Sequence, residues 1–223
     1  MQYFTQETID FLWKLRLNNN KTWFTENKHL FNTHVNTPLK ALAQDVFATI
    51  EGDNLTYKVA RIYKDARRVK GGDPYRDNIW FFIEKHTYND DYSTVPGFWF
   101  EISPEGISYG LGYYQAKALT MAKFRARLDK NPKAFLKLVK DSGFEKNGLI
   151  IQGDEYKRKK PAPKNLEDWY NKKLFSIAYN SSSHGELYKD ELKERLSSTY
   201  SSLMPLYNYF ASLDSDPDPR SDL

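Results

Sequence analysis

The spacing of apolar residues changes twice along this chain, and these two changes constrain the fold more than any other feature. Up to about residue 50 the apolar positions recur every three or four residues, which is typical of amphipathic helices. From Tyr57 the pattern alternates with a period of two, and the apolar run at 79–83 indicates an inner strand. Helical spacing returns after about residue 117. Helices, then strands, then helices predict an α+β domain.

The strands are predicted to form an antiparallel meander over about 57–113, packed with the N-terminal and C-terminal helices. The turn residues at 103–106 predict a hairpin that pairs Ile102 with Ile107. Thr37-Pro38 predicts a helix start, 149–153 a last strand, and 166–176 a helix. Residues 1–213 are therefore expected to form a single α+β domain, followed by a disordered acidic tail at 214–223.

Several function classes are excluded by composition. The chain has no Cys, which rules out disulfides, thiolate catalysis and Cys-ligated zinc. Its four His residues lack metal-site spacing, and no Walker A or dinucleotide fingerprint occurs, so we expect no metal and no cofactor. The N-terminus lacks the features of a signal peptide, and no apolar stretch approaches membrane-spanning length. We expect a soluble, cytoplasmic protein without a membrane partner.

The run RIYKDARRVKGGDPYRD at 61–77 contains the main candidate site. Planar arginines grip phosphate or carboxylate bidentately, and backbone amides near adjacent glycines cradle anions. We interpret the run as an anion-binding pocket of either a binding protein or an enzyme. Its candidate ligand-binding residues are Arg61, Lys64, Asp65, Arg67, Tyr75 and Arg76. The alternative is a structural cluster of ion pairs, with Arg61 on Asp65 and Arg76 on Asp73.

One face of the predicted hairpin combines an aromatic ring, a carboxylate and small residues. Glu101 falls opposite Ser108, and Trp99 opposite Gly110. Glycine in a strand marks the close approach of another group, which here is either a ligand or the Trp99 ring. Glu101 is included among the candidate ligand-binding residues, since it could partner Arg61.

A basic segment supports a second hypothesis. Residues 115–174 hold 16 Lys and Arg against 7 Asp and Glu, which favours an acidic partner such as nucleic acid. That alternative function would use basic helices over 117–140 and the KRKK patch at 157–160; the cations are Lys123, Arg127, Lys130, Lys133, Lys137 and Lys140. A third alternative is an interaction protein without chemistry.

Four ordered motifs resemble a bacterial conserved-hypothetical family classed as a domain of unknown function. They are NNNKTWF at 18–24, RIYKDARRVKGGDPYR at 61–76, GLGYY at 110–114 and GDEYKRKKP at 153–161. The positions that carry the resemblance are Asn19, Asn20, Trp23, Phe24, Arg61, Ile62, Asp65, Arg67, Pro74, Tyr75 and Arg125. The chain departs from the family pattern at Arg68 and Gly72. The resemblance implies no specific activity, but it adds Trp23 and Arg125 to the candidate ligand-binding residues.

Overall fold

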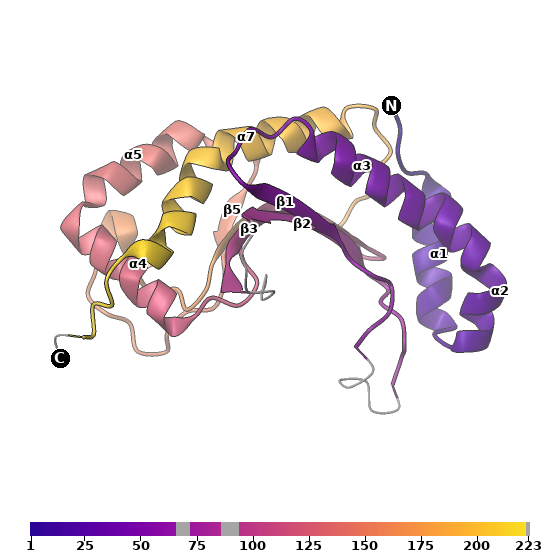
Figure 1. Ribbon diagram of the computed structural model, residues 1–223, viewed down its shortest axis with the longest axis horizontal. Coiled ribbons are helices and arrows are strands. Elements are labelled where there is room, and N and C mark those ends of the chain that lie inside the picture. The colour runs from indigo at the N-terminus through magenta and orange to yellow at the C-terminus, as the bar shows by residue number, and fades with distance from the viewer. Residues whose placement is uncertain (66–71, 86–93, 222–223) are drawn as a thin grey trace.

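The computed structural model describes residues 1–65, 72–85 and 94–221, and it confirms the predicted α+β fold (Figure 1). Six strands form one antiparallel sheet in the order β1-β2-β3-β4-β6-β5. The first four strands follow one another along the chain as the predicted meander. The strands are β1 (Leu55–Val59), β2 (Ile79–Lys85), β3 (Pro96–Ser103), β4 (Gly106–Tyr113), β5 (Ile150–Gln152) and β6 (Ser176–Ser181).

Helices precede and follow the meander. The longer ones are α1 (Gln6–Leu17), α2 (Lys21–Phe31), α3 (Thr37–Phe47), α4 (Ala118–Lys130), α5 (Pro132–Ser142) and α7 (Leu192–Ala211). Short helical segments are η1 (Asn32–Asn36), η3 (Phe144–Asn147), η4 (Lys164–Leu166), α6 (Glu167–Tyr170) and η5 (Ser212–Ser215). Helices α3 and α7 lie side by side along one face of the sheet, as expected for the terminal helices (Figure 1). Helix α7 continues through Pro205 to its end at Ala211.

The hairpin register is confirmed, with Ile102 opposite Ile107 and Trp99 opposite Gly110. Alternate residues of the central strands face α3 and α7 and are almost wholly buried: Phe81, Ile83, Phe98, Phe100, Ile102, Ile107, Tyr109 and Leu111. Phe98 stacks on Tyr200 and Tyr207 of α7 at centroid distances of 4.9 and 5.1 Å. Such burial of aromatic area is the main driving force for joining the sheet to its helices.

Helix α3 begins at Thr37 with Pro38 in its first turn, as predicted, but Thr37 is itself helical and does not act as a cap. Helix α2, the π-helical η1 and α3 follow one another without a break, and Asn36, Thr37 and Pro38 are all helical. Proline has no N–H to donate to the carbonyl four residues back, which belongs to His34. That carbonyl instead accepts a hydrogen bond from Thr8 Oγ1 at 2.7 Å. A contact from α1 therefore satisfies the group that Pro38 leaves without a helical donor.

The predicted helix at 166–176 is wrong beyond Tyr170. Only η4 and the four-residue α6 are helical there, and Ser176 begins strand β6, which the sequence pattern did not indicate. Strand β6 fits beside β4 because β4 carries glycines where it approaches. A Cβ on Gly110 would lie 2.0 Å from the carbonyl oxygen of Ile177, and one on Gly112 would lie 2.6 Å from the Ser176 Cα. Any larger residue would push the two strands apart.

The face of the sheet opposite α3 and α7 has a different character. Its partly exposed residues come from β2, β3 and β4, and we call them the open face: Trp80, Trp99, Glu101 and Ser108. In Figure 1 this is the concave side of the sheet, and no described helix runs along it between the α1–α2 pair and the α4–α5 pair. The open face is thus a sheet surface that the described helices leave uncovered.

Candidate functional site

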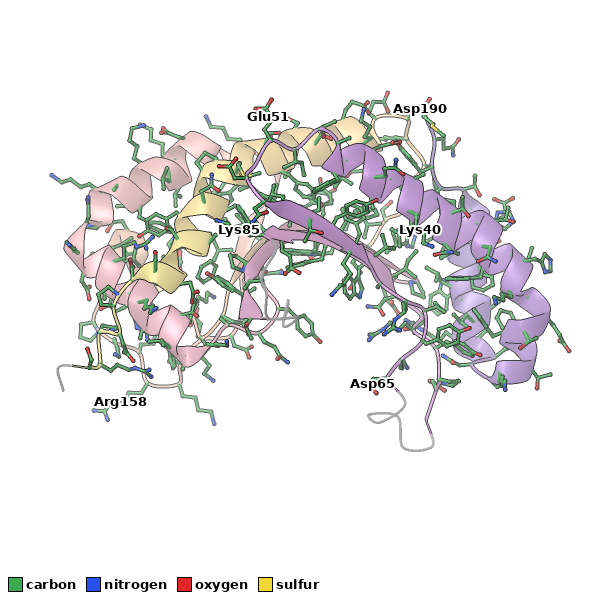
Figure 2. The ribbon with its side chains drawn as sticks, in the orientation of Figure 1. Lys40, Glu51, Asp65, Lys85, Arg158 and Asp190 are labelled. Carbon is green, nitrogen blue, oxygen red and sulfur yellow. The ribbon has the colours of Figure 1, made fainter. Side chains whose placement is uncertain are left out.

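Beyond β1 and β2 the chain continues as two paired extended segments, 60–65 and 72–78, which we call the arm (Figure 2, where Asp65 is labelled near its lower end). The Ala60 N–H donates to the Trp80 carbonyl at 2.9 Å, the Arg76 N–H to Ile62 at 2.7 Å and the Lys64 N–H to Pro74 at 2.9 Å. The regular strand therefore ends at Val59. The alternating pattern that begins at Tyr57 continues beyond it as the paired extended backbone of the arm.

A two-residue bulge separates the arm from the sheet. Val59 lies opposite Phe81, yet Tyr63 lies opposite Tyr75, so the second segment uses two more residues than the first over this stretch. Bulges bend a strand and redirect its side chains, and they are frequent next to functional sites. Here the bulge turns the arm away from the sheet and toward α2.

The root of the arm is held by residues that carry the family resemblance. Asn19 Nδ2 donates to the Tyr75 carbonyl and Asn19 Oδ1 accepts from the Tyr75 N–H, each at 3.0 Å. The Phe24 ring stacks on Tyr75 at 4.2 Å. Asn20 caps α2 by accepting from the Trp23 N–H at 3.0 Å, which fixes the start of that helix. The backbone at Tyr75 is thus fixed both by its amide and by its ring.

A second anchor joins the arm to α1. Arg16 forms ion pairs with Asp77 and Glu105, and its Nη2 lies 3.1 Å from Glu105 Oε2. The Arg16 guanidinium lowers the pKa of Glu105 to about 2. Glu105 is in the β3–β4 turn, so Arg16 ties the arm, the first helix and the hairpin together. The sequence pattern did not single out Arg16, because this residue occurs on the apolar stripe of α1. Helical spacing alone does not indicate that Asp77 and Glu105 are its partners.

Arg76 and Asn78 project from the arm toward the open face. Asn78 Nδ2 donates to Glu101 Oε2 at 3.1 Å. Burial raises the pKa of Glu101, and the nearby Asp77 charge adds to this, while the Asn78 hydrogen bond and the Arg76 charge oppose it. Asn78 was also missed, although its spacing of two from Trp80 could have placed it on the same side of the strand.

Trp99 itself fills the space above Gly110. A Cβ on Gly110 would lie 2.9 Å from Cη2 of the Trp99 ring, and the indole Nε1 donates to Ser108 Oγ at 3.3 Å. Of the two groups predicted for that glycine, the Trp99 ring is the one nearby, although the Ile177 carbonyl of β6 approaches more closely still. The ring remains partly exposed, so it offers an aromatic surface beside Glu101.

The structure brings some predicted site residues together and separates others. Tyr75 is buried at 4% exposure, and Trp23 packs on Phe11 at 5.6 Å. Arg61 is exposed, and Lys64 and Asp65 are partly exposed along the arm. Arg125 lies on α4, where its guanidinium sits 5.3 Å from the Tyr156 ring centroid, within a different part of the fold. Arg67, with Arg68 and Lys70, lies outside the described residues.

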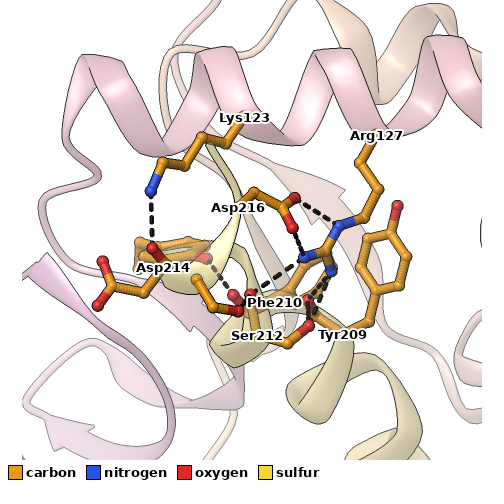
Figure 3. A network of polar contacts seen from close by, with 9 residues as sticks. Lys123, Arg127, Tyr209, Phe210, Ser212, Asp214 and Asp216 are labelled. Carbon is orange, nitrogen blue, oxygen red and sulfur yellow. Dashed lines mark hydrogen bonds and ion pairs between the residues drawn. The ribbon is translucent and has the colours of Figure 1, made fainter. Parts of the chain in front are cut away.

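The basic helix α4 uses two of its cations inside the fold (Figure 3). Lys123 is buried, and its Nζ donates to the Asp214 carbonyl at 2.7 Å. Arg127 donates hydrogen bonds to both carboxylate oxygens of Asp216, at 2.8 and 2.7 Å. The start of the acidic tail is therefore attached to α4. Neither cation forms part of a free basic stripe, although the patch at 157–160 is exposed.

Two broader properties limit what the site contains. Within residues 1–65, 72–85 and 94–221, no three His, Asp or Glu side chains gather closely enough to hold a metal ion. The helices in the same ranges include none with the length and apolar character of a membrane span.

Comparison with known protein families agrees with the family resemblance of the sequence. No curated protein matches the chain. A family model described as "Conserved hypothetical protein (DUF2461)" matches residues 7–209, which include both anchors of the arm and all six strands. The match covers most of the chain, and this protein therefore belongs to the DUF2461 family.

Proposed function

We propose that this protein binds a small molecule carrying a phosphate or carboxylate group where the arm meets the open face, with Arg76 as the principal cation. The observation that carries the proposal is that Arg76 has no carboxylate at ion-pair distance anywhere in the described ranges, although it lies close enough to Glu101 to influence its pKa. An arginine held beside an open surface in this way keeps its planar donors available for an anion.

The other arm cations support this assignment to different degrees. Alternation along the paired segments puts Lys64 on the same side as Arg76, and Tyr63 with Tyr75 on the side of α2. Lys64 and Arg61 also lack a carboxylate partner among the residues that the structure describes. Arg61 falls on the side of Tyr63, so we assign the direct contact to Arg76 and Lys64. By contrast Arg16, Arg127 and Arg195 are all paired.

Rigidity at the root of the arm supports a binding role. A binding group contributes most when its backbone is already fixed, because less conformational entropy is lost on association. Tyr75, which directly precedes Arg76, is held by Asn19 and Phe24, and Asp77, which directly follows it, is held by Arg16. The family-resemblance residues at 19–24 thus act on the position of Arg76 rather than on the ligand.

The open face supplies the remaining chemistry of the proposed site. The partly exposed rings of Trp80 and Trp99 offer flat apolar surface for the uncharged part of a ligand. The pKa of Glu101 is higher than that of an ordinary glutamate, because its carboxylate is partly shielded from water. That property suits a group that donates or accepts a proton next to a bound anion.

Replacing Arg76 with alanine should remove most of the stabilisation that inorganic phosphate or sulfate gives to the protein. Hydrogen bonds to a charged group contribute about 1.5–3 kcal/mol, so we expect the apparent dissociation constant to rise by more than about tenfold. Thermal unfolding with increasing anion measures this directly. The ligand-free melting temperature should hardly change, because Arg76 forms no ion pair with any residue in the described ranges. Arg158→Ala, which changes an exposed arginine on a separate loop, is the control (Figure 2). Equal anion responses in the two variants would contradict the proposal.

Replacing Glu101 with glutamine should have the opposite effect on binding. Glu101 competes with an anion for Arg76, so its neutral amide should tighten sulfate binding severalfold at neutral pH. In the unmodified protein, sulfate binding should strengthen as the pH falls and Glu101 takes up its proton, whereas in Glu101→Gln this dependence should vanish. The folded pKa of Glu101 is raised, so its proton stabilises the fold at low pH and that contribution is lost as the pH rises through the folded pKa. Calorimetric titration with sulfate, which keeps its double charge across this range, tests the sign.

The nucleic-acid alternative is less favoured because Lys123 and Arg127 are engaged with the C-terminal segment. Binding of short DNA or RNA that falls steeply with salt and is lost on changing the exposed patch at 157–160 would reinstate it. A protein that responds to neither small anions nor nucleic acid would instead support the non-catalytic interaction role.

A further inference from the structure

A cavity lies away from the arm, at the N-terminal end of α7. Its volume is about 880 Å³, which is within the usual range for small-molecule sites. The walls come from η3, the turn before α7 and the first two turns of α7. Its charged lining consists of Lys146, Lys189 and Arg195 against Glu186, Glu191 and Glu194. Leu192 is the one apolar side chain of this lining, so the cavity suits a polar ligand.

Arg195 is oriented by three neighbours, Tyr109, Tyr179 and Glu186. Its Nε donates to the Tyr109 hydroxyl at 2.6 Å and lies 3.2 Å from Glu186 Oε2. The guanidinium sits 5.1 Å from the centroid of the Tyr179 ring. Both polar contacts use Nε of the guanidinium. Its terminal nitrogens, Nη1 and Nη2, make no hydrogen bond within the part of the chain that the structure describes.

The groups that hold Arg195 are themselves fixed. Tyr109 is wholly buried and stacks on Tyr179 at 4.8 Å, and the Tyr179 hydroxyl donates to Glu186 Oε1 at 3.0 Å. Burial raises the pKa of Tyr109, so its hydroxyl stays neutral and does not cancel the arginine charge. The result is a preoriented guanidinium whose outer edge, two parallel donors, matches the two oxygens of a carboxylate.

The charge balance of the walls selects the kind of carboxylate. Three cations face three glutamates, so a dianion such as phosphate gains at Arg195 but is repelled by Glu191 and Glu194. A ligand that carries one negative and one positive group is attracted both by Arg195 and by these glutamates. We propose that this cavity binds a free α-amino acid, with its carboxylate on the Nη1–Nη2 edge of Arg195 and its ammonium on Glu191 or Glu194 in the first turn of α7.

The test is calorimetric titration of the full chain with the common L-amino acids and glycine, compared with acetate, methylammonium and inorganic phosphate. We expect at least one amino acid to bind more tightly than acetate, methylammonium and phosphate, because only the zwitterion engages both Arg195 and a glutamate. Binding should fall by more than about tenfold in Arg195→Gln and should be unchanged in Arg158→Gln. Since Arg195→Gln also disturbs Tyr109, Ser198→Trp provides a second variant, which fills the cavity from an exposed position and leaves the arginine contacts intact.

The outcomes separate cleanly. Loss of amino-acid binding in Ser198→Trp, with binding retained in Arg76→Ala, would support this site and distinguish it from the arm. Failure of every amino acid to bind would overturn the proposal. Binding that survives both Arg195→Gln and Ser198→Trp would place the ligand elsewhere and would also overturn it. Tighter binding of phosphate than of any amino acid at this cavity would contradict the zwitterion assignment.

Discussion

Replacing Tyr75 with alanine should cost about 3–5 kcal/mol of unfolding free energy, a large share of the 5–15 kcal/mol typical of a folded protein. The ring is 4% exposed and is surrounded by Phe24 at 4.2 Å and Tyr63 at 5.3 Å. Phe24 is 2% exposed, so it cannot move into the resulting cavity without giving up its own packing. Urea unfolding followed by circular dichroism measures the loss.

The matched change, Tyr75→Phe, separates the ring from the hydroxyl. It keeps the stack on Phe24 and the two Asn19 hydrogen bonds, which involve only the Tyr75 backbone. We therefore expect a stability change within about 1 kcal/mol and an unchanged response to sulfate. A large loss of sulfate binding in Tyr75→Phe would show that the hydroxyl contacts the anion, as the sequence-based assignment of Tyr75 to the ligand suggested. Equal destabilisation by Phe and Ala would contradict the packing role.

The meander was predictable because its information is local. Period-two spacing and the turn at 103–106 set the hairpin register, and a slip of one residue would move every apolar side chain of β3 to the wrong face. Strand β6 was missed for the complementary reason. Ile177 fits both a helical and a strand spacing, and the decisive feature is Gly110 and Gly112 on a distant strand, which make room for it.

The candidate site was predictable in composition but not in geometry. Tyr75 and Asn19 are 56 residues apart, and their pairing depends on a bulge that no local pattern indicates. The motifs therefore indicated segments that meet at the arm without showing that Tyr75 faces the α2 side and Arg76 the open face. The Arg195 cavity gave no signal at all, because Tyr109, Tyr179 and Glu186 come together only when β4, β6 and the following turn pack against α7.

Replacing Arg127 with alanine should cost about 3 kcal/mol, as expected when one partner of a largely buried ion pair is removed. Its side chain is 21% exposed and binds Asp216 through Nε and Nη2 (Figure 3). The same guanidinium donates to the carbonyls of Tyr209 and Ser212 and lies 4.9 Å from the Tyr209 ring centroid. Arg127→Lys should not restore stability, because an ammonium cannot make these contacts in the same plane.

Arg220→Ala is the matched control, since Arg220 also pairs with an aspartate of the same C-terminal segment. That pair, with Asp218, is 52% and 36% exposed, so its loss should leave the unfolding free energy unchanged within error. If Arg127→Ala proved as mild as Arg220→Ala, the C-terminal segment would not be held by α4, and Arg127 would be available to an acidic partner. A large loss of unfolding free energy in Arg127→Ala alone would mean that this cation of α4 stabilises the fold, because its charge is already paired with Asp216.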